Sequence, residues 1–244
     1  DQLSEEMLQF MSDNRVDIKH VKKVTGSTTG LYLISLVNGE RTFSYWRNNS
    51  AAKLLAQSPD DLESAMKDQD IIYFSGITLA ILDTNSRENL FSGLKLARHA
   101  GTKIAFDPNI RPKLWTDRNE MCEVIMAGAN LSNIILPSFE DEAAWFSDTD
   151  PNSTLARYRN VGAETIVVKN AGKPISFFSE QEMGIHNIKA IEKIVDSTAA
   201  GDSFNSEILV GLLRKIPIND AINNGVNLAK KVIVGKGALV PSNV

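Results

Sequence analysis

The sequence predicts an α/β fold in which a mostly parallel sheet is covered by helices on both faces. Short apolar runs alternate with amphipathic stretches of roughly 10–15 residues, which is the pattern of strands joined by helical crossovers. The 244 residues suffice for one large domain of this class. No repeat, low-complexity tract or Pro/Ser-rich linker divides the chain, so we expect a single domain over residues 1–244.

The composition limits which binding partners and which cellular compartment we expect for this protein. Hydrophobic residues make up 43% and charged residues 23% of the chain, which excludes disordered and collagen-like classes. The net charge is −4 and no basic block occurs, so neither nucleic acid nor a membrane surface is an expected partner. The one cysteine, Cys122, and the lack of a signal-peptide pattern favour a cytoplasmic protein.

The beginning of the chain reads as internal. It starts at Asp1 without a methionine, and Leu3, Met7 and Phe10 recur at helical spacing from the first residues. We therefore expect a helix at the start and a part of the protein upstream of it.

A β-ribbon follows this helix. Alternating segments 31–37 and 41–47 flank Asn38-Gly39, a strong signal for a two-residue hairpin turn. Such a turn pairs Tyr32 with Tyr45 on one face of the ribbon, and Arg47 shares that face. A generic hairpin also favours these residue types, so the pattern by itself leaves open whether they bind a ligand.

The remaining elements alternate. Ser58 as N-cap and Pro59 at the first helical position predict a helix to about Lys67. Further strands are predicted at 70–76, 103–107, 133–136, 164–169, 174–179 and 185–188, and further helices at 86–100, 117–129, 140–146, 153–161, 202–214 and 219–234.

The loop at residues 195–205 carries the clearest chemistry. It joins a strand end to a helix start through small residues, so a phosphate could approach backbone N–H groups at the positive end of the helix. Asp202 stands beside that anion site, where a carboxylate can take a proton from an attacking hydroxyl. Helix capping is the alternative role for such an aspartate.

The run from Asp196 to Phe204 resembles the C-terminal signature of the ribokinase-like (PfkB) carbohydrate kinases. The resemblance implies a three-layer α/β/α ribokinase-like fold with a ribbon lid at about 30–48 and a nucleotide-binding part at about 164–244. It also implies ATP and Mg²⁺ as cofactors. The anion hole would be Ala199, Ala200 and Gly201, and the catalytic base Asp202.

Two further segments resemble 2-keto-3-deoxygluconate kinases. The stretch 107–115 is similar to the segment whose arginine meets the sugar acid, here Arg111. The stretch 40–47 is similar to their lid strand, so the resemblance implies that Tyr32, Tyr45 and Arg47 also bind the substrate. The implied reaction is transfer of phosphate from ATP to the terminal hydroxyl of that acid.

The segments that correspond to the family's nucleotide-binding residues match the family pattern less closely. The resemblance implies contacts by Lys169, Asn170, Gly172, Thr198, Gly201, Asn227, Gly237 and Ala238. It implies that Glu142 helps to hold magnesium through water, although Phe139 stands where the family has an asparagine.

Three other readings are open. One is a kinase of the same family for a neutral sugar such as fructose or ribose, and another is a non-catalytic sugar- or nucleotide-binding module. A Rossmann dehydrogenase is disfavoured because no Gly-x-Gly-x-x-Gly opens a helix after a strand. The ribbon lid of the family often pairs between subunits, so a homodimer is expected.

Overall fold

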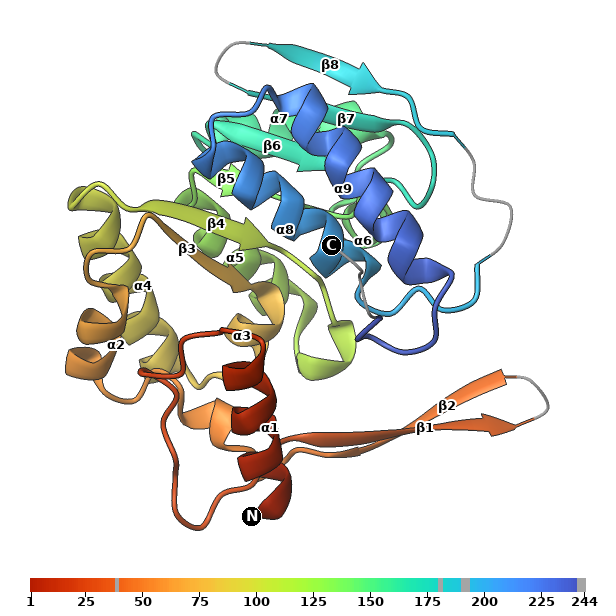
Figure 1. The fold of residues 1–244 in the computed structure, drawn as a ribbon. Helices are drawn as coiled ribbons and strands as arrows, with labels where there is room; N and C mark the ends of the chain where they lie inside the picture. Colours follow the sequence, from red (N-terminus) through yellow and green to blue (C-terminus); the bar gives the residue numbers. More distant parts are fainter. Residues whose placement is uncertain (38–39, 180–181, 190–193, 241–244) are drawn as a thin grey trace. The chain divides into compact units, whose positions relative to one another are not determined.

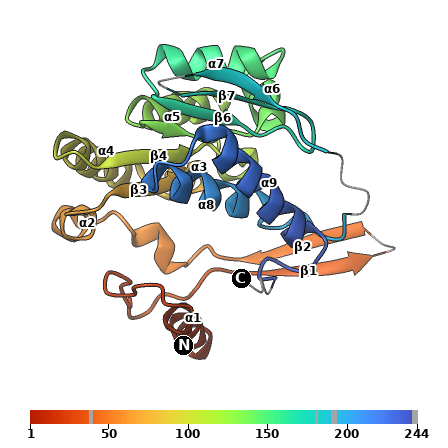
Figure 2. The ribbon, with the colours of Figure 1, turned by 45° about the horizontal axis from the view of Figure 1, so that its top comes forward.

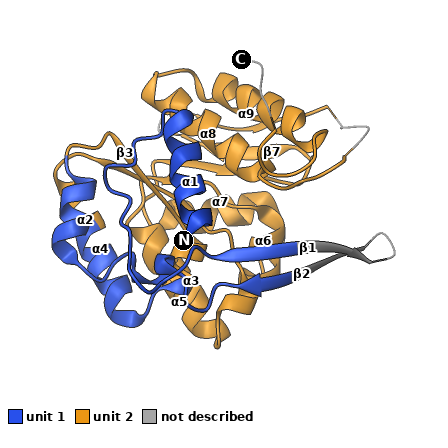
Figure 3. Ribbon diagram, turned by 60° about the horizontal axis from the view of Figure 1, so that its bottom comes forward, with its two compact units in different colours: residues 1–67, 81–93 blue, residues 68–80, 94–244 orange. Residues whose placement is uncertain are grey.

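The computed structural model describes residues 1–37, 40–179, 182–189 and 194–240, so the predicted turn at Asn38-Gly39 lies outside the described residues. The chain divides into two compact units, which Figure 3 colours separately. Unit 1 comprises Asp1–Lys67 and Ile81–Gly93, and unit 2 comprises Asp68–Ala80 and Leu94–Val244. That the whole chain forms a single domain stays a prediction.

Unit 1 holds the predicted first helix and the ribbon. Helix α1 (Gln2–Asp13) begins at Asp1, whose side chain accepts a hydrogen bond from the Ser4 amide. The ribbon register confirms the predicted pairing of Tyr32 with Tyr45. The other elements of the unit are β1 (Leu31–Val37), β2 (Glu40–Trp46), the 3₁₀ helix η1 (Ala51–Leu54), α2 (Pro59–Met66) and the first part of α4 (Thr84–His99).

Unit 2 is built on a six-stranded sheet in the order β3-β4-β5-β6-β7-β8. The first four strands are parallel, and β7 and β8 are added antiparallel at one side. This confirms the predicted mostly parallel sheet. The strands are β3 (Ile71–Ser75), β4 (Lys103–Asp107), β5 (Ile134–Ile135), β6 (Thr165–Val168), β7 (Ile175–Phe178) and β8 (Met183–His186).

Helices cover both faces of this sheet, as Figures 1 and 2 show. On one face, α8 (Ala200–Leu213) and α9 (Ile218–Ile233) pack a buried cluster onto the strands, in which Phe204 and Ile208 meet Val167. The other face carries α5 (Arg118–Asn130), α6 (Phe139–Phe146) and α7 (Pro151–Asn160). The residues of the inner strands are buried on both sides, which explains their unbroken apolar runs.

Two elements differ from the sequence predictions. Helix α3 (Gly76–Ile81) was not expected, because its six residues follow β3 directly and are too few to show a helical period. A Cβ on Gly76 would lie 1.9 Å from the Pro108 carbonyl oxygen, so only glycine lets β3 turn into α3 at this place. Strand β8 covers Met183–His186 rather than 185–188, because its pairing with β7 sets its limits.

The short 3₁₀ helices η1 and η2 (Pro112–Leu114) were also not predicted. In the described part of the chain, no helix has both the length and the apolar character needed to cross a membrane.

Candidate active site

Polar side chains from three strands, or from directly after them, converge on the first turns of α8. Asp107 ends β4, Lys169 follows β6, and Tyr73 lies on β3. The Lys169 ammonium lies 2.8 Å from Asp107 Oδ2 and donates to Asn205 Oδ1 at 3.0 Å. Asn205 Nδ2 donates to Asp107 Oδ2 at 2.7 Å and to the Tyr73 hydroxyl at 3.2 Å. The four side chains therefore form one continuous hydrogen-bond network.

This network is largely shielded from water. Asp107 and Asn205 are buried, and the Lys169 side chain is 12% exposed. Burial raises the pKa of Tyr73, and the negative charges of Asp107 and Asp202 add to the rise. The Tyr73 hydroxyl therefore stays protonated at neutral pH.

Asp202 lies in the first turn of α8 and is exposed. The helix begins after Ala199, whose φ of 62° is in the left-handed region, and within the described residues no side chain caps this start. A Cβ built on Gly201 would meet no atom within 4 Å. The Ala200 N–H donates to the Ser197 carbonyl at 3.3 Å, so it is not an open donor. That Ala199, Ala200 and Gly201 hold an anion beside the exposed Asp202 carboxylate stays a prediction.

Asp196 ties this loop to the C-terminal loop. Its Oδ1 accepts from the Thr198 amide at 2.9 Å and from the Thr198 hydroxyl at 2.6 Å. Its Oδ2 accepts from the Gly237 amide at 3.0 Å. The structure thereby brings together two segments predicted to contact the nucleotide, and Ala238 is exposed beside Gly237.

The loop after β4 carries Arg111. Asp107 Oδ1 accepts from the Asn109 amide at 3.0 Å and so shapes the turn that precedes the arginine. Arg111 donates to the Ile110 carbonyl at 3.0 Å, lies 3.9 Å from Asp141, and keeps about half of its side chain exposed. Its guanidinium thus has donors left for a ligand.

Glu142 does not face this site. It is fully buried, 2.7 Å from the Arg157 guanidinium and 3.0 Å from the donating Tyr158 hydroxyl. Burial raises its pKa to about 7 although Arg157 lowers it. Its polar contacts are thus made to Arg157 and Tyr158, and the role of Glu142 in holding a hydrated magnesium ion stays a prediction.

Asp141, one residue earlier, is the better candidate for magnesium. Burial raises the pKa of Asp141; Arg111 opposes this rise, and the neighbouring charges of Asp107 and Glu140 add to it. A bound cation would offset the repulsion among these negative charges. In the described part of the chain no group of three or more His, Cys, Asp or Glu side chains could hold a metal. Mg²⁺ often keeps several waters and needs one or two carboxylates, so Asp141 fits this type of site.

The loop after β6 has some groups that are bonded within the protein and others that are open to a ligand. The ammonium of Lys169 is engaged by Asp107 and Asn205. Asn170 donates to the Pro174 carbonyl at 3.3 Å and closes the turn, in which Gly172 has a φ of 83°. Asn227 is exposed on α9. The backbone of this turn, rather than the Lys169 side chain, is therefore the part open to a ligand.

The ribbon of unit 1 places its three predicted residues together. The rings of Tyr32 and Tyr45 lie 6.3 Å apart, and the Arg47 guanidinium lies 4.2 Å from the centre of the Tyr45 ring. Both tyrosines are about half exposed. The predicted cluster of two phenols and a guanidinium is present.

The sequence analysis assigned no role to Tyr73, Asp107, Asp141 or Asn205. Asp107 and Asn205 lay inside the motifs that were singled out. The position of Asp107 at the end of a parallel strand is a signal that could have found it. Tyr73 within β3, Asp141 on α6 and Asn205 on α8 carry no such signal.

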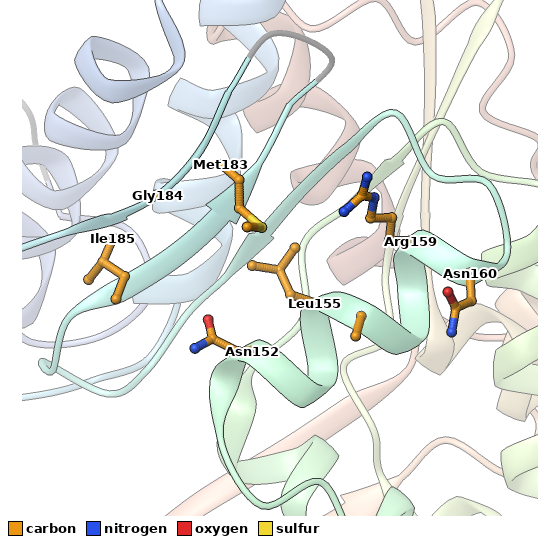
Figure 4. A pocket seen from close by; sticks show the side chains of 8 residues that line it. Asn152, Leu155, Arg159, Asn160, Met183, Gly184 and Ile185 are labelled. Carbon is orange, nitrogen blue, oxygen red and sulfur yellow. The ribbon is translucent and has the colours of Figure 1, made fainter.

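A groove of unit 2 includes none of these residues. It lies between α7 and β8 and is lined by Leu155, Arg159, Met183 and Ile185 among others (Figure 4). Among the described residues that line it, Arg159 is the one ionisable side chain, and most of the others are apolar.

Known proteins are similar to this chain in sequence. The pfkB family carbohydrate kinase pattern matches residues 1–243. A 2-dehydro-3-deoxygluconokinase of Haemophilus influenzae is 37% identical, with 98% of this chain and 78% of the relative covered. The enzyme of that name from Escherichia coli K12 is 35% identical, with 99% and 80% covered.

Solved structures agree in fold. A PfkB protein from Polaromonas has a TM-score of 0.84 at 24% identity, with 96% of this chain and 77% of that chain covered. A ribokinase II from E. coli, described as a complex with ATP and Mg²⁺, has a TM-score of 0.84 at 21% identity, with 98% and 75% covered. The chain therefore belongs to the pfkB family of carbohydrate kinases.

Proposed function

We propose that this kinase transfers phosphate from ATP to the terminal hydroxyl of 2-keto-3-deoxygluconate. The observation that carries the chemistry is the exposed Asp202 carboxylate beside the open start of α8. The relatives named 2-dehydro-3-deoxygluconokinase support the choice of sugar.

In this reaction Asp202 accepts the proton of the terminal hydroxyl as that oxygen bonds to the γ-phosphorus and the bond to ADP breaks. The backbone N–H groups of Gly201 and Asp202, at the start of α8, stabilise the charge on the transferred group. Asp141 would hold magnesium, which supplies positive charge to the phosphates when bound. The turn at Asn170 to Gly172, together with Thr198, Asn227 and the Gly237-Ala238 loop, binds the nucleotide.

Arginine suits the acid end of the sugar. The half-exposed Arg111 guanidinium gives a carboxylate two parallel hydrogen bonds, which an uncharged sugar cannot use. We also propose that Tyr32, Tyr45 and Arg47 of the ribbon bind the sugar. Their mutual contacts hold the phenols and the guanidinium in place.

A panel of sugar acids and neutral sugars, assayed with ATP and magnesium by ADP release, tests the substrate. We expect turnover with 2-keto-3-deoxygluconate and much weaker turnover with fructose or ribose. Arg111→Ala should raise KM for the acid by about 10- to 100-fold, because a charge-assisted bidentate contact is lost. Lys113→Ala, an exposed cation on the same loop, is the matched control.

Other results of this panel decide between the alternatives. Better turnover of a neutral sugar, unaffected by Arg111→Ala, would favour a kinase for that sugar. Nucleotide binding without ADP release on any substrate would favour a binding module.

We propose further that two copies pair through the ribbon. Leu33 and Trp46 of β1 and β2 are each more than half exposed, and a second copy could cover them. Size-exclusion chromatography at micromolar concentration should give the mass of a dimer, and a monomer would contradict the pairing.

A further inference from the structure

The carboxylate of Asp107 accepts hydrogen bonds from three segments of the chain. Its Oδ1 accepts from the Asn109 amide, in the loop that leads to Arg111. Its Oδ2 accepts from Asn205 on α8 and from Lys169 after β6. One buried group thus connects the arginine loop, the helix of Asp202 and the loop after β6.

Asn205 completes the connection. Its amide accepts from Lys169 at 3.0 Å and donates to Asp107 at 2.7 Å and to Tyr73 at 3.2 Å. The side chain is 1% exposed, so water does not replace a lost partner. Asn205 follows Asp202 by three residues, within one turn of α8, so whatever fixes Asn205 also fixes the backbone of Asp202.

Asp202 itself is exposed, in contrast to the buried groups beneath it. An exposed carboxylate explores several rotamers, and its place relative to a substrate depends on the backbone that carries it. A buried amide with every polar atom bonded holds that backbone tightly, since each lost bond leaves a buried polar group unpaired.

We propose that Asp107 and Asn205 are positioning residues, which hold Asp202 and the Arg111 loop in one fixed geometry for phosphoryl transfer. This inference rests on the proposed function, in which Asp202 is the base. The pair touches neither the sugar nor the nucleotide and acts on the rate through the residues it holds.

The first test replaces the amide by a carboxylate. In Asn205→Asp the new acid faces Asp107, Lys169 and Tyr73 within the network and Asp202 on its own helix. Two carboxylates so close need a shared proton, so the correct geometry returns only at lower pH. We expect kcat at pH 8 to fall by about 10- to 100-fold while nucleotide affinity changes little. As pH falls, the kcat of Asn205→Asp should recover relative to that of the wild type at the same pH.

The second test exchanges the two side chains. Asp107→Asn alone leaves Lys169 buried without a carboxylate, and Asn205→Asp alone adds a second one. The double variant Asp107→Asn/Asn205→Asp again offers one carboxylate and one amide to Lys169. Its kcat should exceed that of both single variants by about tenfold. A double variant that is folded but no faster than the single variants would overturn the inference.

Controls separate positioning from stability. Ser206→Ala removes an exposed hydroxyl that donates to the Ser203 carbonyl on the same helix, and it should leave kcat unchanged. Tyr73→Phe removes one hydrogen bond of Asn205 without changing charge, and it should lower kcat several-fold at unchanged nucleotide affinity. It tests the inference even where the charge variants do not fold, and a wild-type kcat for Tyr73→Phe would contradict it.

The variant Asp202→Asn separates a failure of the proposed base from a failure of the proposed positioning residues. If Asp202→Asn retains full turnover, Asp202 is not the base. Asp107 and Asn205 then have no catalytic group to position, and the positioning role is wrong as well. If Asp202→Asn abolishes turnover while Asn205→Asp keeps the wild-type kcat and pH profile, the positioning role alone is wrong.

Discussion

Asp107 and Asn205 meet at 2.7 Å although 98 residues separate them in the sequence. Each belongs to a motif with its own expected function, the sugar-acid loop in one case and the anion loop in the other. Their contact is possible because β4 ends at the same edge of the sheet where α8 begins. The two halves of the expected chemistry are therefore coupled through buried side chains.

Asp202→Asn should lower kcat by about 10²- to 10⁴-fold, the usual contribution of a general base. The amide keeps the shape of the side chain but cannot accept the proton. Nucleotide affinity, measured by calorimetry without sugar, should stay near that of the wild type. Undiminished ADP release would remove Asp202 from the role of base.

Gly201→Ala should separate catalysis from stability. The new methyl group meets no atom of the protein, so the free energy of unfolding should stay equal or rise by up to about 1 kcal/mol. The same methyl group occupies the space where a phosphate approaches the helix start, and kcat should fall by about 10- to 100-fold. Thermal unfolding and ADP release measure the two effects. Unchanged kcat would place the anion elsewhere.

Gly76→Ala should act in the opposite way, on stability first. Its Cβ would lie 1.9 Å from the Pro108 carbonyl oxygen and 2.7 Å from Ile125, so the backbone has to move. We expect a loss of about 1–3 kcal/mol in the free energy of unfolding, measured by urea denaturation. Gly201→Ala is the matched glycine-to-alanine control. Wild-type stability of Gly76→Ala would show that the close approach is not maintained in solution.

Glu142 should make stability depend on pH. Its pKa is raised from 4.5 to about 7 in the folded protein, so between these values the unfolded chain loses the proton while the folded protein keeps it. The contribution of Glu142 to the free energy of unfolding therefore falls as pH rises through this window, by on the order of 1–3 kcal/mol.

Glu142→Gln should flatten this dependence. Urea denaturation at pH 5 and pH 8 should show a smaller stability difference for the variant than for the wild type. Glu123→Gln, an exposed carboxylate on α5, should leave the difference unchanged. An equal difference in Glu142→Gln and the wild type would contradict a raised pKa.

Much of the fold was predictable because its signals are local. Asn38-Gly39 between alternating segments predicts the ribbon and its register, and the structure confirms that Tyr32 pairs with Tyr45. Ser58 and Pro59 similarly predict the start of α2. Helix α3 escaped prediction because its six residues are too few to show a helical period. The close approach of Gly76 to the distant Pro108 is likewise recorded by no local pattern.

The candidate site shows the same division. Continuous motifs point to Asp202 and Arg111, whose roles stay predictions. The resemblance to the family motif names Glu142 alone, but Glu142 packs against Arg157 and Tyr158, while Asp141 lies beside Arg111. A difference of one residue on a helix rotates the side chain by about 100°, so only the packed helix decides which carboxylate meets the site.

By itself, the sequence determined the alternation of the strands and the longer helices, the ribbon register and the residue types available for phosphoryl transfer. These follow from periodicity, turn chemistry and small residues, which act over a few positions. The tertiary structure decided which polar groups are buried together, namely Asp107 with Lys169, Asn205 and Tyr73. Burial and partnership depend on strands that come together from distant parts of the chain, and a buried charge is tolerated only where such partners meet it.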